Sequence, residues 1–404
     1  MKPEIVHIEG GITAAPGFRA GGVHCGIRRR KLDLALLVSD RPATVAGVFT
    51  TNKAQAAPVL ANRIQLRQTE TCQAVAVNSG VANACTGERG LEDAWQMIRQ
   101  TAAALGLPED QVLVSSTGVI GEYLPMEKIT TGIAQLAPLL SPEGAHQAAL
   151  AIMTTDTCSK EYAVRVRIGG VPVTIGAMAK GSGMIAPNMA TMLAFIATDA
   201  AVTQPALQLM LGRACQLSFN RISVDGDTST NDMAIVLANG MAQNPTVTEG
   251  TPEFDQLADA LTHVMIVLAK MIARDGEGAQ KLIEIQVRGA ATESEAEQAA
   301  RAVANSNLVK TAIHGADANW GRILAAVGYS GIEFNPEQLS ICLNGVPILA
   351  PGYQIVIDEE KAKRALEWEE VTILIDLFRG DHEVRFWTCD LTKEYVHINA
   401  SYRS

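Results

Sequence analysis

The sequence has few aromatic residues, no excess of basic residues and no cysteine pair in metal-binding spacing. Hydrophobic residues nevertheless make up 48% of its 404 residues and aromatic residues 4%. A chain of this length and composition can bury a sizeable core, in two or three domains or in one large α/β body. The formal charge of −10 argues against a nucleic acid or an anionic membrane as the main partner, because both bind basic surfaces.

The cysteines and histidines do not form a metal-binding pattern. His24 and Cys25 are adjacent, but no further ligand pair follows at useful spacing. No two cysteines are in CxxC spacing, so neither a zinc site nor a disulfide framework is indicated, and no metal is expected. We expect seven reduced residues that serve in packing: Cys25, Cys72, Cys85, Cys158, Cys215, Cys342 and Cys389.

No apolar segment reads as a membrane span or a secretory signal. The uncharged stretch 181–198 is long enough, but its glycine, proline, asparagine and threonine content is unfavourable in a membrane. The first eleven residues carry acidic side chains and lack an apolar core. A soluble cytoplasmic protein is expected.

Strand-like and helix-like patterns alternate along the chain. An apolar strand at 74–78, a helix near 91–105 and a strand at 112–115 form an α/β unit, and 163–168 with 171–175 form a hairpin around Gly169-Gly170. Helix starts are expected at Ser141-Pro142-Glu143 and at Thr251-Pro252-Glu253. From residue 338 onward strands dominate, with one helix near 359–370. These patterns predict helices layered on a mixed sheet.

Two loops resemble ligand-binding motifs and fail on detail. The segment 176–183 (GAMAKGSG) is not a phosphate loop, because Lys180 precedes the glycine that it should follow. The acidic segment 225–232 lacks the glycine and the terminal glutamate of a calcium loop. We therefore interpret the acidic segment as a hydrogen-bonded turn.

Thr191 lies in the segment KGSGMIAPNMATML, which is uncharged after its first residue and is interrupted too often for an ordinary core strand. Most threonines in apolar runs are packed strand residues. Here glycines permit unusual backbone angles, Pro187 fixes the approach and Ala190 leaves its carbonyl open. Attack of the Thr191 hydroxyl on Ala190 would form an ester that water cleaves, and the freed α-amine, with a reference pKa of about 7.7–8.0, would act as a base.

Such a nucleophile requires donors for an oxyanion. The segment Ser115-Ser116-Thr117-Gly118 ends a predicted strand and offers a hydroxyl and a backbone N–H. By itself this sequence is a common turn, and it gains meaning only together with Thr191.

Several long motifs together resemble the ArgJ family, the ornithine acetyltransferases of arginine biosynthesis. The motifs are KGSGMIAPNMATML, the STG segment, Thr154-Thr155-Asp156-Thr157, SVDGDTSTND (223–232), RDGEGAQK (274–281), GADANWGRI (315–323) and YVHINA (395–400). They occur in the family's order and cover nearly the whole chain.

The resemblance implies a layered α/β fold, like that of DmpA-type aminopeptidases, that cleaves itself into two chains. The α chain would comprise residues 1–190 and the β chain 191–404, in an α2β2 assembly. Such enzymes move acetyl from N-acetylornithine to glutamate through an acetyl-threonine, without a cofactor, and some also use acetyl-CoA. An aminopeptidase or amidohydrolase of related fold, or a non-catalytic binding protein, remains an alternative.

The resemblance also assigns roles residue by residue. Cleavage falls between Ala190 and Thr191, Thr191 is the nucleophile, and Thr117 and Gly118 form the oxyanion hole. Lys180 suits a substrate carboxylate and Glu277 suits the amino group of ornithine. The substrate-binding positions are Thr154, Lys180, Thr191, Glu277, Asn399 and Ser404.

The sequence departs from the family pattern in three places. Gln280 stands where threonine is expected and Ala318 where proline is expected, and the ending ASYRS differs from the usual tail, so Ser404 is a weaker assignment than Asn399. Chemistry alone does not separate Thr154 from Thr157.

Overall fold

The computed structural model describes residues 4–186 and 192–401 and divides into two compact units. The first unit comprises Met1–Gly181, Pro187–Asn220 and Thr228–Leu268. The second comprises Ser182–Ala186, Arg221–Asp227 and Ala269–Ser404. Each unit is built on a sheet of its own.

The sheet of the first unit has the strand order β1-β6-β7-β8-β10-β3-β4-β5, with β2 also paired to β3. Its pairs β4/β5 and β8/β10 are parallel and the others are antiparallel, so the predicted mixed sheet is confirmed. Its strands are β1 (Val6–Ile8), β2 (Phe18–Val23), β3 (Leu34–Phe49), β4 (Thr71–Val81), β5 (Val112–Val119), β6 (Lys160–Ile168), β7 (Val171–Lys180), β8 (Leu193–Thr198) and β10 (Met233–Ala238).

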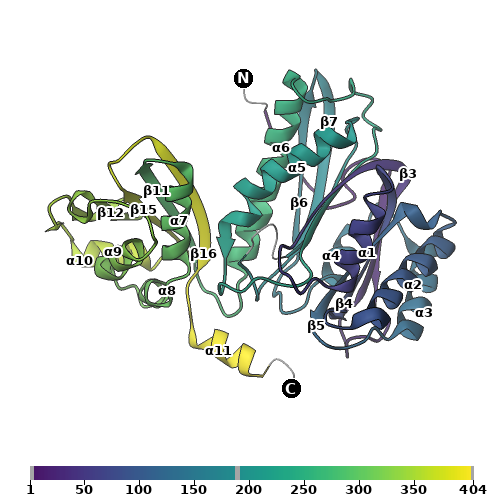
Figure 1. Cartoon of the computed structure of the whole chain (residues 1–404), viewed down its shortest axis with the longest axis horizontal. Coiled ribbons are helices and arrows are strands. Elements are labelled where there is room, and N and C mark those ends of the chain that lie inside the picture. The colour runs from purple at the N-terminus through teal and green to yellow at the C-terminus, as the bar shows by residue number, and fades with distance from the viewer. Residues whose placement is uncertain (1–3, 187–191, 402–404) are drawn as a thin grey trace. The chain divides into compact units, whose positions relative to one another are not determined.

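Helices cover both faces of this sheet because its side chains alternate in direction along each strand. On β3, Leu34 and Leu36 pack with one buried cluster, whereas Ala35 and Leu37 pack with another. The first cluster includes α2 (Gly87–Leu105) and α3 (Met126–Leu136), which lie side by side in Figure 1. The second includes α4 (Ala145–Ala151). The unit also contains α1 (Ala57–Gln65) and α5 (Gln204–Leu217).

Several local predictions are confirmed. The parallel strands β4 and β5 are joined through α2, as a parallel pair requires. Strands β6 and β7 pair as an antiparallel hairpin with Gly169 and Gly170 in the turn.

The predicted helix start at Ser141 is wrong, because Ser141 Oγ accepts from Glu143 N in a turn and α4 begins only at Ala145.

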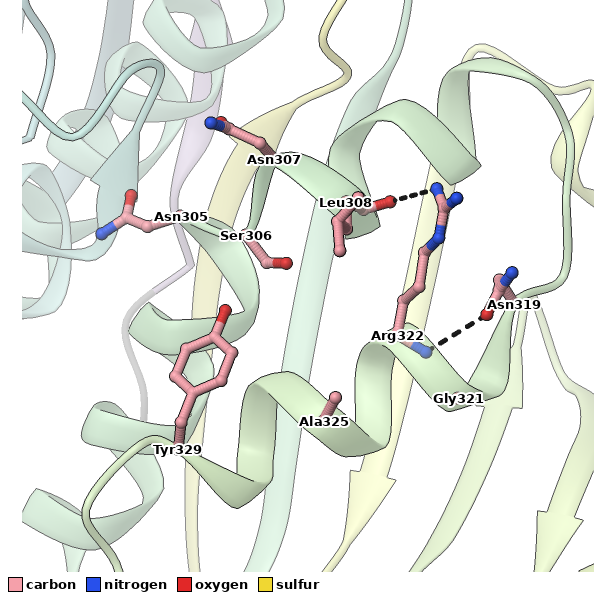
Figure 2. Close-up of a pocket in the computed structure, with 9 residues that line it drawn as sticks. All are labelled: Asn305, Ser306, Asn307, Leu308, Asn319, Gly321, Arg322, Ala325 and Tyr329. Atoms are coloured by element: carbon pink, nitrogen blue, oxygen red, sulfur yellow. Dashed lines mark hydrogen bonds between the residues drawn. The ribbon is translucent and has the colours of Figure 1, made fainter.

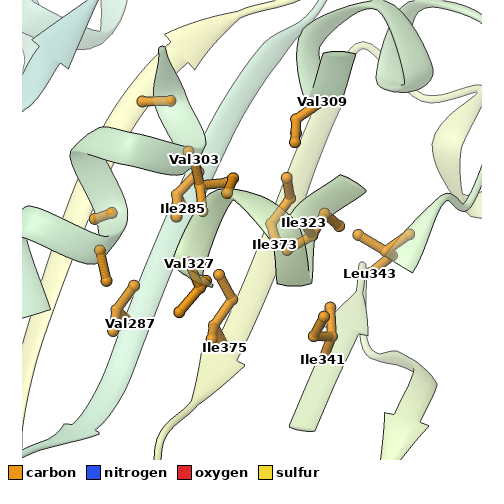
Figure 3. Close-up of a cluster of buried hydrophobic side chains, with 14 of the residues drawn as sticks. Ile285, Val287, Val303, Val309, Ile323, Val327, Ile341, Leu343, Ile373 and Ile375 are labelled. Carbon is orange, nitrogen blue, oxygen red and sulfur yellow. The ribbon is translucent and has the colours of Figure 1, made fainter. Parts of the chain in front are cut away.

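The sheet of the second unit has the strand order β14-β13-β12-β15-β11-β16-β9. Isoleucines at every second position of β11 and β15, including Ile285 and Ile373, pack against Val303 and Val327 from helices (Figure 3). The strands are β9 (Ile222–Ser223), β11 (Leu282–Ala290), β12 (Ser340–Leu343), β13 (Val346–Ala350), β14 (Gln354–Ile355), β15 (Glu370–Asp376) and β16 (His382–Cys389). The helices are α7 (Glu293–Ala304), α8 (Asn307–His314), α9 (Trp320–Gly328), α10 (Glu359–Leu366) and α11 (Lys393–Ala400).

The end of the chain differs from the prediction. The motif YVHINA lies in helix α11, whereas only one helix, near 359–370, was expected after residue 338. The reason is a helix cap: the hydroxyl of Thr392 accepts from Glu394 N and starts α11.

The interpretation of all cysteines as packing residues is wrong, because Cys85 and Cys158 are exposed.

One helix, α6 (Pro252–Arg274), is long and apolar enough to cross a membrane by length and composition alone. Half of its most apolar stretch is buried. The buried residues Leu257, Leu261, Val264 and Leu268 recur on one face of the helix. This spacing is typical of a helix that packs against a protein core. Its start at Thr251-Pro252 matches the sequence prediction, and Thr251 Oγ1 accepts from Phe254 N.

Candidate active site

Thr117 and Gly118 lie at the end of β5, which continues beyond the predicted strand at 112–115. Thr117 pairs with Ser79 of β4 and is buried. The neighbouring Ser116 donates its hydroxyl to Asn78 at 2.6 Å. The strand ladder and this hydrogen bond therefore hold the Thr117 region in one conformation.

Gly118 is required by its backbone and by its surroundings. Its φ is +133°, and an added Cβ would lie 2.2 Å from the carbonyl carbon of Gly80. Both features exclude a side chain at this position. The close approach of β4 and β5 thus explains the glycine of the STG motif.

Lys180 ends β7, and its side chain points toward Thr117. It pairs with Leu193, the first residue of β8, which follows Thr191 by two positions in the sequence. Its Nζ donates to Thr117 Oγ1 at 3.4 Å. The predicted cleavage position and nucleophile, Ala190 and Thr191, lie outside the described residues, as does Ser404. The structure therefore brings Lys180 and Thr117 together near the end of the sheet at which β8 begins.

Asp156 connects the Thr154 segment with the Lys180 segment. Its Oδ2 accepts from Thr154 N at 2.9 Å, and its Oδ1 accepts from Gly181 N at 2.7 Å and from Lys160 Nζ at 2.8 Å. Burial alone would raise the pKa of Asp156, but the charges of Lys180 and Lys160 outweigh it and hold that pKa below its usual range.

Thr154 and Thr157 differ in their surroundings. Thr154 is half-buried, and Arg28 donates to its carbonyl oxygen at 3.1 Å while Asp156 binds its N–H. Thr157 is exposed. These contacts connect Thr154 with Asp156.

Asp232, just before β10, is a buried carboxyl close to the same strand ends. Its Oδ2 has no hydrogen-bond partner among the described residues, and burial raises its pKa well above the usual value. The next residue, Met233, pairs with Leu193, and its N–H donates to Met192 O at 3.0 Å. Burial therefore favours the protonated form of Asp232 beside the start of β8.

In the second unit, Glu277 and Asn399 are in contact. Asn399 Nδ2, on α11, donates to Glu277 Oε2 at 2.7 Å. The Glu277 N–H donates to Ser182 O at 3.0 Å, and a Cβ on Gly183 would lie 2.4 Å from the Glu277 carboxyl carbon. Gly183 therefore makes room for the carboxylate.

The acidic segment 225–232 begins with a hydrogen-bonded turn. Asp225 Oδ1 accepts from Ile185 N at 2.8 Å and from Asp227 N at 3.2 Å, and its Oδ2 accepts from Met184 N at 2.6 Å. Within residues 4–186 and 192–401 no group of three or more potential ligands could hold a metal ion.

The motif GADANWGRI borders a pocket of about 390 Å³ between α8 and α9 (Figure 2). The side chain of Asn319 accepts from Arg322 N and caps α9, and Arg322 NH1 donates to Leu308 O at 2.9 Å. Asn319 and Arg322 of the motif thus cap α9 and connect α9 to α8. No predicted site residue lines this pocket.

Sequence reasoning missed the residues that support the site. It quoted Asp156 only as part of a motif and interpreted the segment containing Asp232 as a turn, because nothing in a local pattern shows which carboxylates become buried. Lys160 carried no signal beyond a strand-like surrounding. The i,i+4 spacing of Asp156 and Lys160 is visible in the sequence, but the burial of the pair is seen only in the structure.

Helices layered on a mixed sheet, with a hydroxyl, an ammonium and buried carboxyls at its strand ends, define an enzyme of the layered α/β class. The model of the ArgJ family matches residues 19–404. The arginine biosynthesis bifunctional protein ArgJ of Symbiobacterium thermophilum is 54% identical over 98% of this chain and 99% of its own. The protein of that name in Bacillus subtilis is 48% identical over 100% of this chain and 99% of its own. The chain belongs to the ArgJ family.

Among solved structures, an ornithine acetyltransferase of Mycobacterium tuberculosis complexed with ornithine is 42% identical. It covers 46% of this chain and 99% of its own, with a TM-score of 0.43. The predicted family, an acetyltransferase family of arginine biosynthesis, is confirmed by the match across the chain.

Proposed function

We propose that this protein cleaves itself before Thr191 and then moves acetyl from N2-acetylornithine to glutamate through an acetyl-threonine. The observation that carries the proposal is the family match over residues 19–404, which includes every proposed site residue. The contact between Lys180 and Thr117 at the strand end that precedes β8 supports it.

Self-cleavage would begin when Thr191 Oγ attacks the carbonyl carbon of Ala190. The Ala190–Thr191 amide becomes an ester, and the nitrogen of Thr191 takes the hydroxyl proton. Water then hydrolyses the ester, which leaves a carboxylate on Ala190 and a free amine on Thr191. At a reference pKa of about 7.7–8.0, a useful fraction of this amine is neutral near pH 7.

Acetyl transfer would use the same hydroxyl. Thr191 Oγ attacks the acetyl carbon of N2-acetylornithine while its amine accepts the hydroxyl proton and passes a proton to the departing nitrogen of ornithine. The amine of glutamate then attacks the acetyl-threonine, and the threonine hydroxyl is restored. Thr117 Oγ1 and the N–H of Gly118 would stabilise the oxyanion in both halves.

The charged residues fit the two amino-acid substrates. Lys180 would bind a carboxylate, and Glu277, held by Asn399, would bind the side-chain ammonium of ornithine. Thr154 and Ser404 would complete the polar contacts. No cofactor is required, and acetyl-CoA would serve as a second acetyl donor for glutamate, consistent with relatives that are named bifunctional.

Denaturing electrophoresis of the purified protein tests self-cleavage directly. Two fragments, residues 1–190 and 191–404, are expected, and Thr191→Ala should give one uncut band without transferase activity. A single uncut band in active wild-type protein would contradict the proposal.

Parallel assays with N2-acetylornithine and acetyl-CoA then define the donors. Transfer to glutamate from either donor supports the acetyltransferase, whereas hydrolysis without transfer would indicate the aminopeptidase-like alternative. The native mass of the cleaved protein tests the proposed α2β2 assembly.

A further inference from the structure

Lys160 is a fully buried cation that lies beside the proposed site without being one of its assigned residues. Its side chain and that of Asp156 are both 0% exposed, and Lys160 Nζ lies 2.8 Å from Asp156 Oδ1. Ionised groups are seldom buried unless they are paired, because leaving water costs several kcal/mol per ion. A packed apolar pair of similar volume is often at least as stable as a buried ion pair, so stability alone does not account for these two charges.

A second cation, Lys180, also acts on the carboxylate of Asp156. Lys160 begins β6 and pairs with Ala179 of β7, so the residue after its partner is Lys180. Asp156 also accepts from the N–H of Gly181, the residue after Lys180. The buried carboxylate therefore pairs directly with Lys160 and holds the backbone next to Lys180, whose charge also lowers the pKa of Asp156.

We propose that Lys160 is a positioning residue for Lys180: it offsets the charge of Asp156, so that this carboxylate holds the backbone of the site without drawing the ammonium of Lys180 away from an anionic substrate group. The inference rests on the proposed function of Lys180. Lys160 itself, being fully buried, does not touch the substrate.

A pair of variants separates this charge role from packing. In Lys160→Met the shape is largely retained while Asp156 loses the cation that pairs with it at 2.8 Å, so its charge acts more strongly on Lys180 and the KM for N2-acetylornithine should rise about tenfold with a smaller change in kcat. In Lys160→Met/Asp156→Asn both charges are gone, and asparagine keeps one carbonyl oxygen for the N–H of Gly181. The double variant should recover most of the lost affinity.

Lys281→Met is the matched control. Lys281 is also a buried lysine, but its Nζ donates to carbonyl oxygens at the ends of α8 and α10, Ile313 O at 2.8 Å and Leu366 O at 2.7 Å. This variant should lose thermal stability with an unchanged KM. Circular dichroism and thermal melts establish that each variant is folded.

Recovery of KM in the double variant, after a raised KM in a folded Lys160→Met, supports the inference. A pair that serves stability alone would change the thermal melts and leave KM unchanged in both variants. A KM in Lys160→Met within about twofold of wild type, or a double variant worse than the single one, would overturn it. Where Lys160→Met does not fold, the neutral double variant decides: a KM near wild type supports the inference and a KM raised about tenfold overturns it. Absence of acetyl transfer in wild-type protein is a separate result that contradicts the proposed function itself.

Discussion

The ammonium nitrogen of Lys180 lies 3.4 Å from the hydroxyl oxygen of Thr117, although their strands β7 and β5 are separated by β8, β10, β3 and β4 in the sheet. Neighbouring strands are about 4.8 Å apart, so in a flat sheet these two would be roughly 24 Å apart. The sheet must therefore twist and curl strongly to form this contact.

Strand β3 makes the curl possible. Its first half pairs with both β2 and β4 and its second half pairs with β10, and a register shift in the β4 pairing lies between Val38 and Ala43. Asn231, just before β10, then bridges the ends of the other strands by donating to Ser116 O at 2.8 Å and to Ala82 O at 2.6 Å. The candidate site lies where the curled sheet brings distant strand ends together.

Thr117→Ala should lower kcat about 10²- to 10³-fold, because one oxyanion donor is typically worth about 2.7–4 kcal/mol in the transition state. Thr117→Ser retains the hydroxyl and should retain most of the activity. Steady-state kinetics with N2-acetylornithine and glutamate give the comparison, and an unchanged kcat in the alanine variant would remove Thr117 from the oxyanion hole.

Gly118→Ala should disrupt the strand end, because its Cβ would lie 2.2 Å from Gly80 and its φ is +133°. Gly121→Ala is the control: its φ is +85°, but no atom lies within 4 Å of the added Cβ. The control should cost about 1 kcal/mol from backbone strain alone, and Gly118→Ala clearly more. Thermal or urea unfolding measures both, and equal losses would show that Gly80 yields to the added methyl group.

The stability of Asp232→Asn relative to wild type should increase as the pH rises from about 4 toward 7. Burial raises the pKa of Asp232 in the folded protein, so the folded state releases this proton at a higher pH than the unfolded chain, which releases it near pH 4. Rising pH therefore costs wild-type stability in this range, and asparagine has no proton to lose. The melting temperatures of both proteins across this range provide the test.

Asp33→Asn should show the opposite dependence. Burial would raise the pKa of Asp33, but backbone N–H donors, those of Arg28 and Cys25 among them, outweigh it and lower that pKa. Its stabilisation is thus present above about pH 4 and is lost as the pH falls through the depressed value, so the deficit of the variant should be largest near neutral pH. Parallel slopes for the Asp232 and Asp33 variants would contradict this assignment of protonation states.

Glu277→Gln should raise the KM for N2-acetylornithine about tenfold, because a charge-assisted hydrogen bond to the ornithine ammonium is lost. Acetylation of glutamate from acetyl-CoA should change less, since that reaction involves no ornithine. Glu284→Gln is the control, because Glu284 accepts from Trp387 Nε1 at 2.8 Å and pairs with Lys270 within the same unit. Equal effects on both reactions would argue against a contact of Glu277 with ornithine.

The sequence by itself determined the family and the local elements of the fold. Periodicity placed β4, α2 and β5 and the β6–β7 hairpin, because these depend on neighbours in the chain and on turn residues such as Gly169 and Gly170. The motifs located Thr117, Gly118 and Lys180, because the chemistry that they would serve restricts residue type. The Thr392 cap of α11 was missed because a single hydroxyl before a mixed segment is a weak signal.

Only the tertiary structure decided which charges are buried and which strand ends meet. The burial of Asp156 with Lys160, the raised pKa of Asp232 and the contact between Lys180 and Thr117 all depend on how the sheet and its surroundings pack. Burial and long-range register arise from contacts between segments far apart in the chain. A local sequence pattern does not encode such contacts, so these pairings were recognised only when the fold placed the residues together.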